Sequence, residues 1–162
     1  MTHKITLERN KLRFSAAHFT TFGDECEPLH GHNYDVLVEI EGSLTADSWV
    51  LDFGDVKKLV AGICGELDHK FLLPLRNSAL DVTASHDEVE IRFADRRYVM
   101  PAADVARLEI DNSTAERLAE WFAGRIQQAL SDRSAQNVTN VTVGIEEAPG
   151  QAGWFTLHAQ SG

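Results

Sequence analysis

Apolar and polar side chains alternate along the first part of the chain, with one polar interruption. Between residues 4 and 18 the alternating apolar positions are Ile5, Leu7, Leu12, Phe14 and Ala16. His18 ends this run with the parity of Phe14, residues 19–29 are mostly polar, and residues 33–41 alternate again. Period-two alternation is typical of a strand with one buried face. We therefore predict two long strands that are joined by an irregular loop and paired antiparallel.

Two later stretches repeat apolar residues at intervals of three and four, which predicts amphipathic helices. The first spans residues 55–67, and Asp52 or Asp55 could cap its start. The second begins near residue 113, where Ser113 and Glu116 have the spacing of a capping box.

Alternation returns in three further places. Residues 138–146 and 154–158 predict two more strands, and Val89 and Ile91 belong to a small predicted hairpin. Helices grouped between two antiparallel strand pairs indicate an α+β fold. We expect a single domain over residues 1–162, with an insertion at about 77–110 that has too few apolar residues for a core of its own.

Charge and composition narrow the classes of partner. The 162 residues include 25 acidic and 15 basic side chains, for a formal net charge of -10. A nucleic-acid partner requires a basic surface, so we expect none. No stretch has the length and apolarity of a membrane span, and the first residues do not resemble a secretory signal. We expect a cytoplasmic protein whose two cysteines are free thiols.

Three histidines in one short region are the strongest candidates for chemistry. His30 and His32 lie two residues apart, so both face the same side of a strand, and His18 would come from the neighbouring strand. Three converging imidazoles leave a fourth position open, as catalytic zinc sites do. Gly31 favours this interpretation, since it would let a ligand approach the backbone closely. The alternative is a polar strand end without a metal.

Cys26 lies four residues before His30 and has three possible roles. It could be a fourth metal ligand, a reactive thiol, or a small buried apolar residue. Its polar neighbours argue against burial, and a nearby zinc ion would lower the pKa of the thiol. The residues themselves favour a reactive thiol over a fourth ligand.

Two other positions have both a catalytic and an ordinary explanation. Asp68 precedes His69 at the end of the first predicted helix, where a carboxylate can orient an imidazole. Such a pair also arises by chance or as a helix cap. Glu147 precedes a turn, where a glutamate is usually solvated.

Taken together, six motifs resemble those of one known family, in the same order along the chain. The motifs are Phe14-Ser15-Ala16-Ala17-His18, Cys26-x-x-x-His30-Gly31-His32-Asn33-Tyr34, Val50-Leu51-Asp52-Phe53, Leu67-Asp68-His69-Lys70-Phe71-Leu72, Asn112-Ser113-Thr114-Ala115-Glu116 and Glu147-Ala148-Pro149. They are similar to the 6-pyruvoyltetrahydropterin synthase / 6-carboxytetrahydropterin synthase family. The resemblance covers nearly the whole chain except about 77–110.

The resemblance implies a fold, an assembly and a set of roles. The fold would be the tunnelling fold, with two antiparallel strand pairs and two helices on one side. Three subunits would close a barrel, two trimers would stack into a hexamer, and active sites would lie between subunits. The implied roles are Zn²⁺ ligation by His18, His30 and His32, catalysis by Cys26, Asp68 and His69, and substrate binding by Glu147, Glu27 and Thr114.

The implied activity is that of a zinc-dependent lyase acting on 7,8-dihydroneopterin triphosphate. A cysteine four residues before His-Gly-His resembles the subgroup that makes 6-carboxy-5,6,7,8-tetrahydropterin for 7-deazaguanine and queuosine synthesis. Glu27, three residues before His30, resembles a subgroup that cleaves dihydroneopterin to 6-hydroxymethyldihydropterin. 6-Pyruvoyltetrahydropterin synthesis is a further alternative. Outside this class, the chain could be a pterin- or purine-binding zinc protein without turnover, or a general zinc hydrolase.

Overall fold

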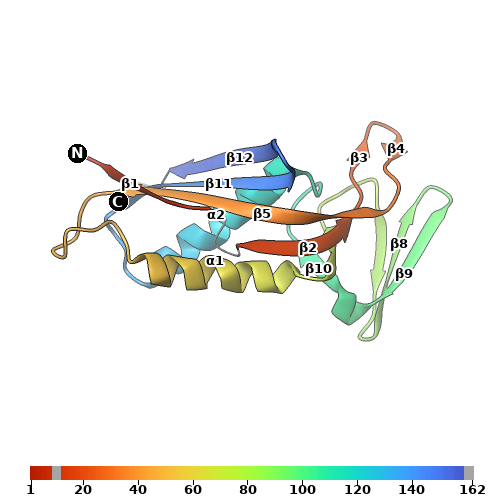
Figure 1. Ribbon diagram of the computed structural model, residues 1–162. Coiled ribbons are helices and arrows are strands. Elements are labelled where there is room, and N and C mark those ends of the chain that lie inside the picture. The colour runs from red at the N-terminus through yellow and green to blue at the C-terminus, as the bar shows by residue number, and fades with distance from the viewer. Residues whose placement is uncertain (9–11, 159–162) are drawn as a thin grey trace.

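The computed structural model describes residues 1–8 and 12–158 (Figure 1). Its strands are β1 (His3–Leu7), β2 (Arg13–His18), β3 (Thr21–Phe22), β4 (Glu25–Cys26), β5 (His30–Gly42), β6 (Lys70–Pro74), β7 (Asp81–Ala84), β8 (Glu88–Phe93), β9 (Arg96–Pro101), β10 (Val105–Leu108), β11 (Val138–Ala148) and β12 (Gln151–His158). The helices are α1 (Phe53–Leu67), α2 (Ala115–Asp132) and the short 3₁₀ helix η1 (Ala102–Asp104). None of the described helices is long and apolar enough to cross a membrane.

Seven strands form one mixed sheet with α1 and α2 packed on it, so the fold is α+β as predicted. The strand order is β10-β6-β2-β5-β11-β12, and β1 also pairs with β5. The predicted antiparallel pairs β2–β5 and β11–β12 are confirmed. The expectation of two antiparallel pairs alone was incomplete, because β6 runs parallel to both β2 and β10.

The predicted strand over residues 4–18 is two strands, β1 and β2, which lie along the same side of β5. Residues 9–11 between them lie outside the described residues. The predicted irregular loop of residues 19–29 contains a small hairpin, β3–β4, with Gly23 at its turn. Gly23 has φ 55°, a left-handed conformation that glycine adopts without steric cost.

Both helices form where their periodicity predicts, but only one of the two predicted N-caps is correct. Asp52 is the N-cap of α1, and its Oδ1 accepts a hydrogen bond from the Asp55 backbone N–H at 3.0 Å. At α2 the N-cap is Thr114, whose side chain accepts from the Arg117 N–H. The predicted capping box starting at Ser113 was wrong by one residue, because the Ser113 hydroxyl instead donates to the carbonyl of Phe19 at 3.0 Å.

The main core lies between the two helices and the sheet. Phe14 stacks on Tyr34 with ring centroids 4.7 Å apart, and on Phe122 of α2 at 5.8 Å. Each such aromatic pair adds roughly 0.5–1.5 kcal/mol beyond the burial of its area. This stack ties β2 and β5 to α2, and its Tyr34 ring lies edge-on to the rings of His18 and His32.

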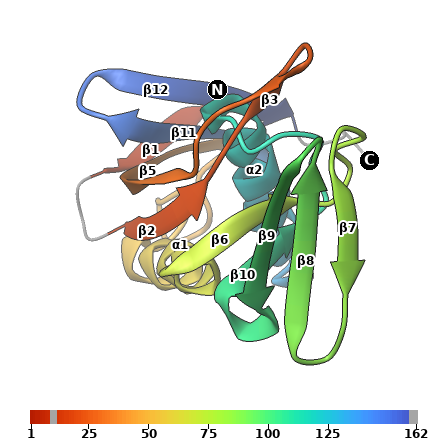
Figure 2. The same cartoon turned by 90° about the vertical axis from the view of Figure 1, so that its right-hand side faces the viewer.

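A second buried cluster lies where residues 77–110 meet the main sheet (Figure 2). Its members are Phe19, Cys26, Phe71, Leu73, Val89, Ile91 and Val105. The predicted hairpin is confirmed as β8–β9, and β7 adds a third strand to it. The apolar residues of this segment therefore share a core with β4 and β6. That the segment is an insertion stays a prediction.

Candidate metal centre and substrate pocket

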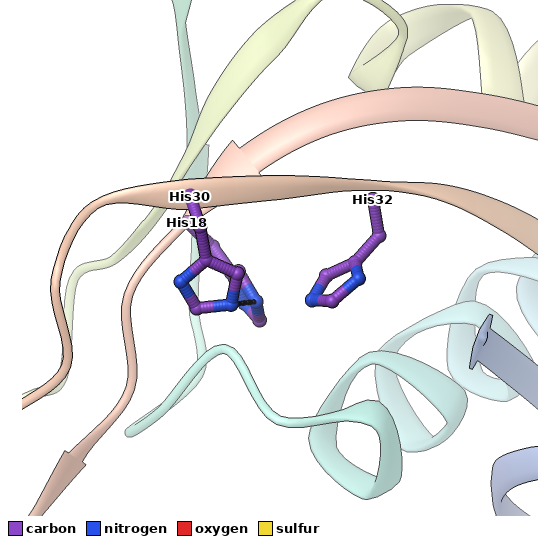
Figure 3. Close-up of side chains that lie close together, drawn as sticks. All are labelled: His18, His30 and His32. Carbon is purple, nitrogen blue, oxygen red and sulfur yellow. Dashed lines mark hydrogen bonds between the residues drawn. The ribbon is translucent and has the colours of Figure 1, made fainter.

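The three histidine side chains converge on one face of the β2–β5 strand pair (Figure 3). His18 lies directly opposite His30, and Ala16 lies opposite His32. Directly opposite residues of antiparallel strands point to the same face, and so do residues two apart on one strand. The ring centroids are 4.7, 5.1 and 5.0 Å apart, and one nitrogen from each ring lies within 4.8 Å of the others. The predicted convergence is confirmed.

Backbone carbonyl groups fix the orientation of two of the rings. His18 Nδ1 lies 2.9 Å from the Ser113 carbonyl oxygen, and His30 Nδ1 lies 2.8 Å from that of Pro28. A carbonyl can only accept, so both Nδ1 atoms carry the proton and donate. In the neutral rings each Nε2 is then left with its lone pair.

The two Nε2 atoms of His18 and His30 lie 3.1 Å apart. Two lone pairs at this distance repel one another unless a proton or a metal cation lies between them. Burial is the main reason that the pKa of His18 falls to about 4, which keeps this ring neutral and able to ligate. A tetrahedral zinc site separates its nitrogen ligands by about 3.3 Å. The donor set therefore fits a metal ion bound by three imidazoles.

The loop before α2 holds this end of the helix against the histidines. The Asn112 side-chain amide donates to the Thr21 carbonyl at 2.8 Å, and its oxygen accepts from the Thr21 N–H at 3.2 Å. The adjacent Ser113 supplies the carbonyl that orients His18. The start of α2 is thus positioned by contacts to the chain segment that follows β2. Figure 3 shows this loop passing below the three rings.

Gly31 lies between two of the histidines, but its role differs from the one we expected. A Cβ at this position would lie 2.8 Å from the carbonyl oxygen of Ala16 on the neighbouring strand. Alternation also turns this position to the face opposite the histidines. Close packing of β2 against β5 requires the glycine, so the expectation that it admits a metal ligand was wrong.

A pocket of about 370 Å³ opens beside His18 and His30. Its other walls come from the chain after β4, the first turn of α2 and the β11–β12 turn. Three side chains predicted to bind substrate, Glu27, Thr114 and Glu147, all line it. The pocket has no lysine or arginine in its lining, and Glu116 is a third carboxylate there. The structure thus gathers residues from four separate parts of the sequence.

Glu147 is the penultimate residue of β11 and is half-buried. Burial is the main reason that its pKa is raised. No hydrogen-bond or ion-pair partner for its carboxylate is found among residues 1–8 and 12–158. A desolvated carboxylate without a partner favours a ligand that brings N–H donors to it. The Tyr34 hydroxyl, fully buried beneath the histidines, likewise has no partner in the described part of the chain.

Glu27 is held in the pocket by its own hairpin. The Thr20 N–H donates to Glu27 Oε2 at 3.1 Å, and the Glu27 N–H donates back to the Thr20 carbonyl at 2.9 Å. The same Oε2 lies 4.0 Å from His30 Nε2. Partial burial opposes ionisation, but the hydrogen bonds from Thr20 together with the nearby His30 and His18 outweigh it, so the pKa of Glu27 is lowered. This carboxylate is a charged group next to the candidate metal position.

Cys26 does not line this pocket. It is 6% exposed and packs in the second cluster, so the expectation from its polar neighbours that it avoids burial was wrong. Its Sγ lies 3.5 Å from the Glu27 carbonyl oxygen. Burial raises the pKa of the thiol, and the charge of Arg96 offsets only part of this effect. The three-histidine group does not include it as a ligand.

Asp68 and His69 lie elsewhere, at the end of α1. His69 Nδ1 and Asp68 Oδ2 are 2.9 Å apart, and the Ser15 N–H donates to Asp68 Oδ1 at 2.8 Å. The His69 side chain is 81% exposed and faces a groove of about 560 Å³. The lining of the groove includes Ser15, Ala17, Gly31 and Asn33, which alternate with the histidines along β2 and β5, and it also includes Ala16 and His32 between them. Within one chain this pair and the metal ligands therefore face opposite sides of the sheet.

Besides Thr20, two polar residues near the site were missed in the sequence. Gln151 lines the pocket from the start of β12. Arg96, at the start of β9, donates to the backbone of Cys26 and Glu27. Neither residue has a telling spacing to the histidines, because folding alone brings them close.

Comparison with known proteins gives one consistent result. The family description "6-pyruvoyl tetrahydropterin synthase" matches residues 6–157. A protein of Methanocaldococcus jannaschii named putative 6-carboxy-5,6,7,8-tetrahydropterin synthase is 35% identical over 92% of each chain. A dihydroneopterin monophosphate aldolase of Pyrococcus furiosus is 29% identical over 72% of this chain and 71% of its own.

One solved structure has nearly the same fold as this chain. It is a Plasmodium vivax 6-pyruvoyltetrahydropterin synthase in which a glutamate described as a catalytic residue is replaced by alanine. The two structures agree with a TM-score of 0.91 at 26% identity, over 98% of this chain and 99% of the other.

Proposed function

Because this chain belongs to the 6-pyruvoyl tetrahydropterin synthase family, we propose that it is a zinc-dependent 6-carboxy-5,6,7,8-tetrahydropterin synthase. One observation carries the proposal: three imidazole donors converge, and two of them, His18 and His30, line a pocket that also holds the unpartnered carboxylate of Glu147. The imidazoles would bind a metal, and the Glu147 carboxylate would bind a nitrogen-rich ring. Named relatives from archaea and bacteria support the same activity.

His18, His30 and His32 would hold the zinc ion. Zinc bound there supplies a Lewis acid that lowers the pKa of hydroxyl groups on the substrate side chain. The Ser113 and Pro28 carbonyl groups keep the Nε2 atoms of His18 and His30 directed at the ion. Burial of His18 keeps that ring neutral, so a metal need not compete with a proton for it.

Glu147 and Thr114 would orient the substrate. The Glu147 carboxylate can accept two hydrogen bonds, which matches the adjacent amino and N–H groups of a pterin ring. Thr114 lies across the pocket at the cap of α2. A ring held between these elements would direct its side chain toward the histidines.

Asp68 and His69 would act from a second copy of the chain. The pair faces the opposite side of the sheet from the histidines of its own chain, and the His69 ring is exposed. In an assembly with sites between subunits, one chain would supply the metal ligands and the next would supply His69 as acid or base. We therefore propose a homo-oligomer, a trimer or hexamer, whose pterin sites lie at its interfaces.

A second candidate activity is cleavage of the dihydroneopterin side chain to 6-hydroxymethyldihydropterin. A specific observation favours it: the Glu27 carboxylate lines the pocket, whereas the Cys26 thiol is buried away from it. An aldolase acting on dihydroneopterin monophosphate is among the relatives, and the Plasmodium structure is described as having a catalytic glutamate. Glu27 would serve as the general base for this reaction.

The test is to supply zinc-loaded protein with 7,8-dihydroneopterin triphosphate, and separately with dihydroneopterin and its monophosphate. The products are identified by mass spectrometry. Formation of 6-carboxytetrahydropterin from the triphosphate supports the first proposal, and 6-hydroxymethyldihydropterin from the others supports the second. If bound pterin is recovered unchanged in every case, the chain binds pterins without turnover and both proposals fail.

A further inference from the structure

One arginine of the β8–β9 hairpin contacts the backbone of both Cys26 and Glu27, two candidate catalytic residues that are adjacent in the sequence. Arg96 Nη1 donates to the Cys26 carbonyl at 3.0 Å and to the Glu27 carbonyl at 3.1 Å. These residues are some seventy positions apart in sequence, so the contact exists only because β9 begins beside the β3–β4 hairpin. Hydrogen bonds from a charged donor are about twice as strong as neutral ones.

Cys26 and Glu27 cannot both face the pocket in one backbone conformation. Adjacent residues of an extended chain point to opposite sides. In the structure the Glu27 carboxylate lines the histidine pocket and the Cys26 thiol packs among Phe19, Phe71 and Val105. A rotation of this short segment would exchange the two groups, and it would have to break the contacts that Arg96 makes.

We propose that Arg96 is a positioning residue that holds Glu27 toward the histidine pocket and Cys26 away from it, and so sets which of the two reactions the enzyme favours. The effect of Arg96 on the choice of reaction rests on the proposed function. Its effect on the conformation of residues 26 and 27 does not. Loss of the arginine would release the thiol toward the pocket.

Two other arginines of the same hairpin form ordinary ion pairs at the surface. Arg92 and Arg97 each form an ion pair with Glu90, at 2.6 Å in both cases. Arg96 has no such pair with a carboxylate in the described ranges 1–8 and 12–158. The two carbonyl groups are the hydrogen-bond acceptors that the structure gives its guanidinium. Arg97 therefore provides a matched control, one residue away on the same strand.

The first test measures the thiol without substrate. Cys26 is alkylated with iodoacetamide over a range of pH, and its plateau rate at high pH is followed by peptide mass spectrometry. The plateau removes any effect of the lost charge on the pKa of the thiol. In Arg96→Met we expect the rate to rise about tenfold, as for the loss of a charged hydrogen bond, with little change in Arg97→Met. Arg96→Lys, which keeps a donor, should lie between them.

The second test measures the two reactions in the same variants, at a temperature well below the melting temperature of each of them. In Arg96→Met the ratio of the 6-carboxytetrahydropterin rate to the 6-hydroxymethyldihydropterin rate should rise, and Arg96→Lys should restore it in part. Equal alkylation rates in Arg96→Met and Arg97→Met would overturn the positioning role. An unchanged product ratio would overturn the selective role. If the wild type makes neither product, the proposed function fails while the alkylation result still stands.

Discussion

The two faces of the β2–β5 strand pair differ in how completely one chain builds them. On the face toward the helices, the rings of His18 and His30 have backbone partners for their Nδ1 atoms, and three imidazoles are already gathered. On the other face, His69 contacts Asp68 and is otherwise open. The first face is preorganised for a metal, whereas the second is ready to meet another surface. In the proposed assembly, one active site would combine both faces, taken from different copies.

The largest expected effect comes from removing a metal ligand on the helix-side face. His30→Ala should lose bound zinc and all measurable turnover, because loss of a ligand costs more than the roughly 10–100-fold typical of outer partners. Metal per chain is measured by atomic emission after desalting. His86→Ala is the control, since His86 is exposed and contacts Asp87 far from the site. If His30→Ala retained one zinc per chain, the metal would lie elsewhere.

Glu27→Gln should have the next largest effect and leave the metal in place. If Glu27 is the base of side-chain cleavage, its loss should slow that reaction by about 10²–10⁴-fold.

Cys26→Ala should instead keep its zinc and lose formation of 6-carboxytetrahydropterin. Rates on both substrates are compared with zinc content for each variant. Loss of zinc in Cys26→Ala would make the cysteine a ligand and the site a structural one.

Mixing two inactive variants tests the division between the faces directly. His30→Ala and His69→Ala chains, co-expressed in equal amounts with different tags, should recover about a quarter of wild-type activity by random pairing, or about a third in trimers selected to contain both variants. Each variant alone should be inactive. The mixed oligomers are purified through both tags before assay. A mixture as inactive as its parents would show that the two faces do not combine between copies.

The smallest effect concerns the charge of Asp68. The Ser15 N–H and then His69 lower the pKa of this carboxyl below its usual 3.8. A lowered pKa stabilises the fold above the unfolded pKa, and this contribution is lost as pH falls through the native value. Asp68→Asn should therefore cost less than about 1 kcal/mol at neutral pH, since the carboxyl is partly exposed. The difference in unfolding temperature between the variant and the wild type should shrink as the pH is lowered from 7 through the native pKa of Asp68.

The histidine face could be predicted from the sequence because its geometry is local. His30 and His32 share a face by alternation, and the position of His18 follows once its strand pairs with theirs. Glu147 and Thr114 have no such local signal. They could be connected to the site only through the family resemblance, because α2 and β11 reach the pocket by folding.

Strand β6 was missed for a physical reason. Its residues Phe71, Leu72 and Leu73 are all buried, so no alternation is visible. Leu72 belongs to the main core, while its neighbours on either side belong to the second cluster. A parallel strand covered on both faces has a continuous apolar run, which periodicity alone does not separate from other buried segments.

The position of Cys26 was misjudged because its burial is not encoded nearby. The residues around it are acidic, yet the side chains that cover it come from β6, β8 and β10. Only the second cluster explains why the thiol turns inward while Glu27 turns toward the pocket.

Position 69 has a further consequence, for the balance between durability and activity. His69 has φ 59° and directly follows Asp68, the C-cap of α1, at a position where glycine is the usual choice. A side chain there costs about 1 kcal/mol. His69→Gly should therefore unfold at a higher temperature than the wild type while losing the acid–base group. Selection for thermal resistance alone would discard this histidine, so its presence agrees with the acid–base role that we propose for it.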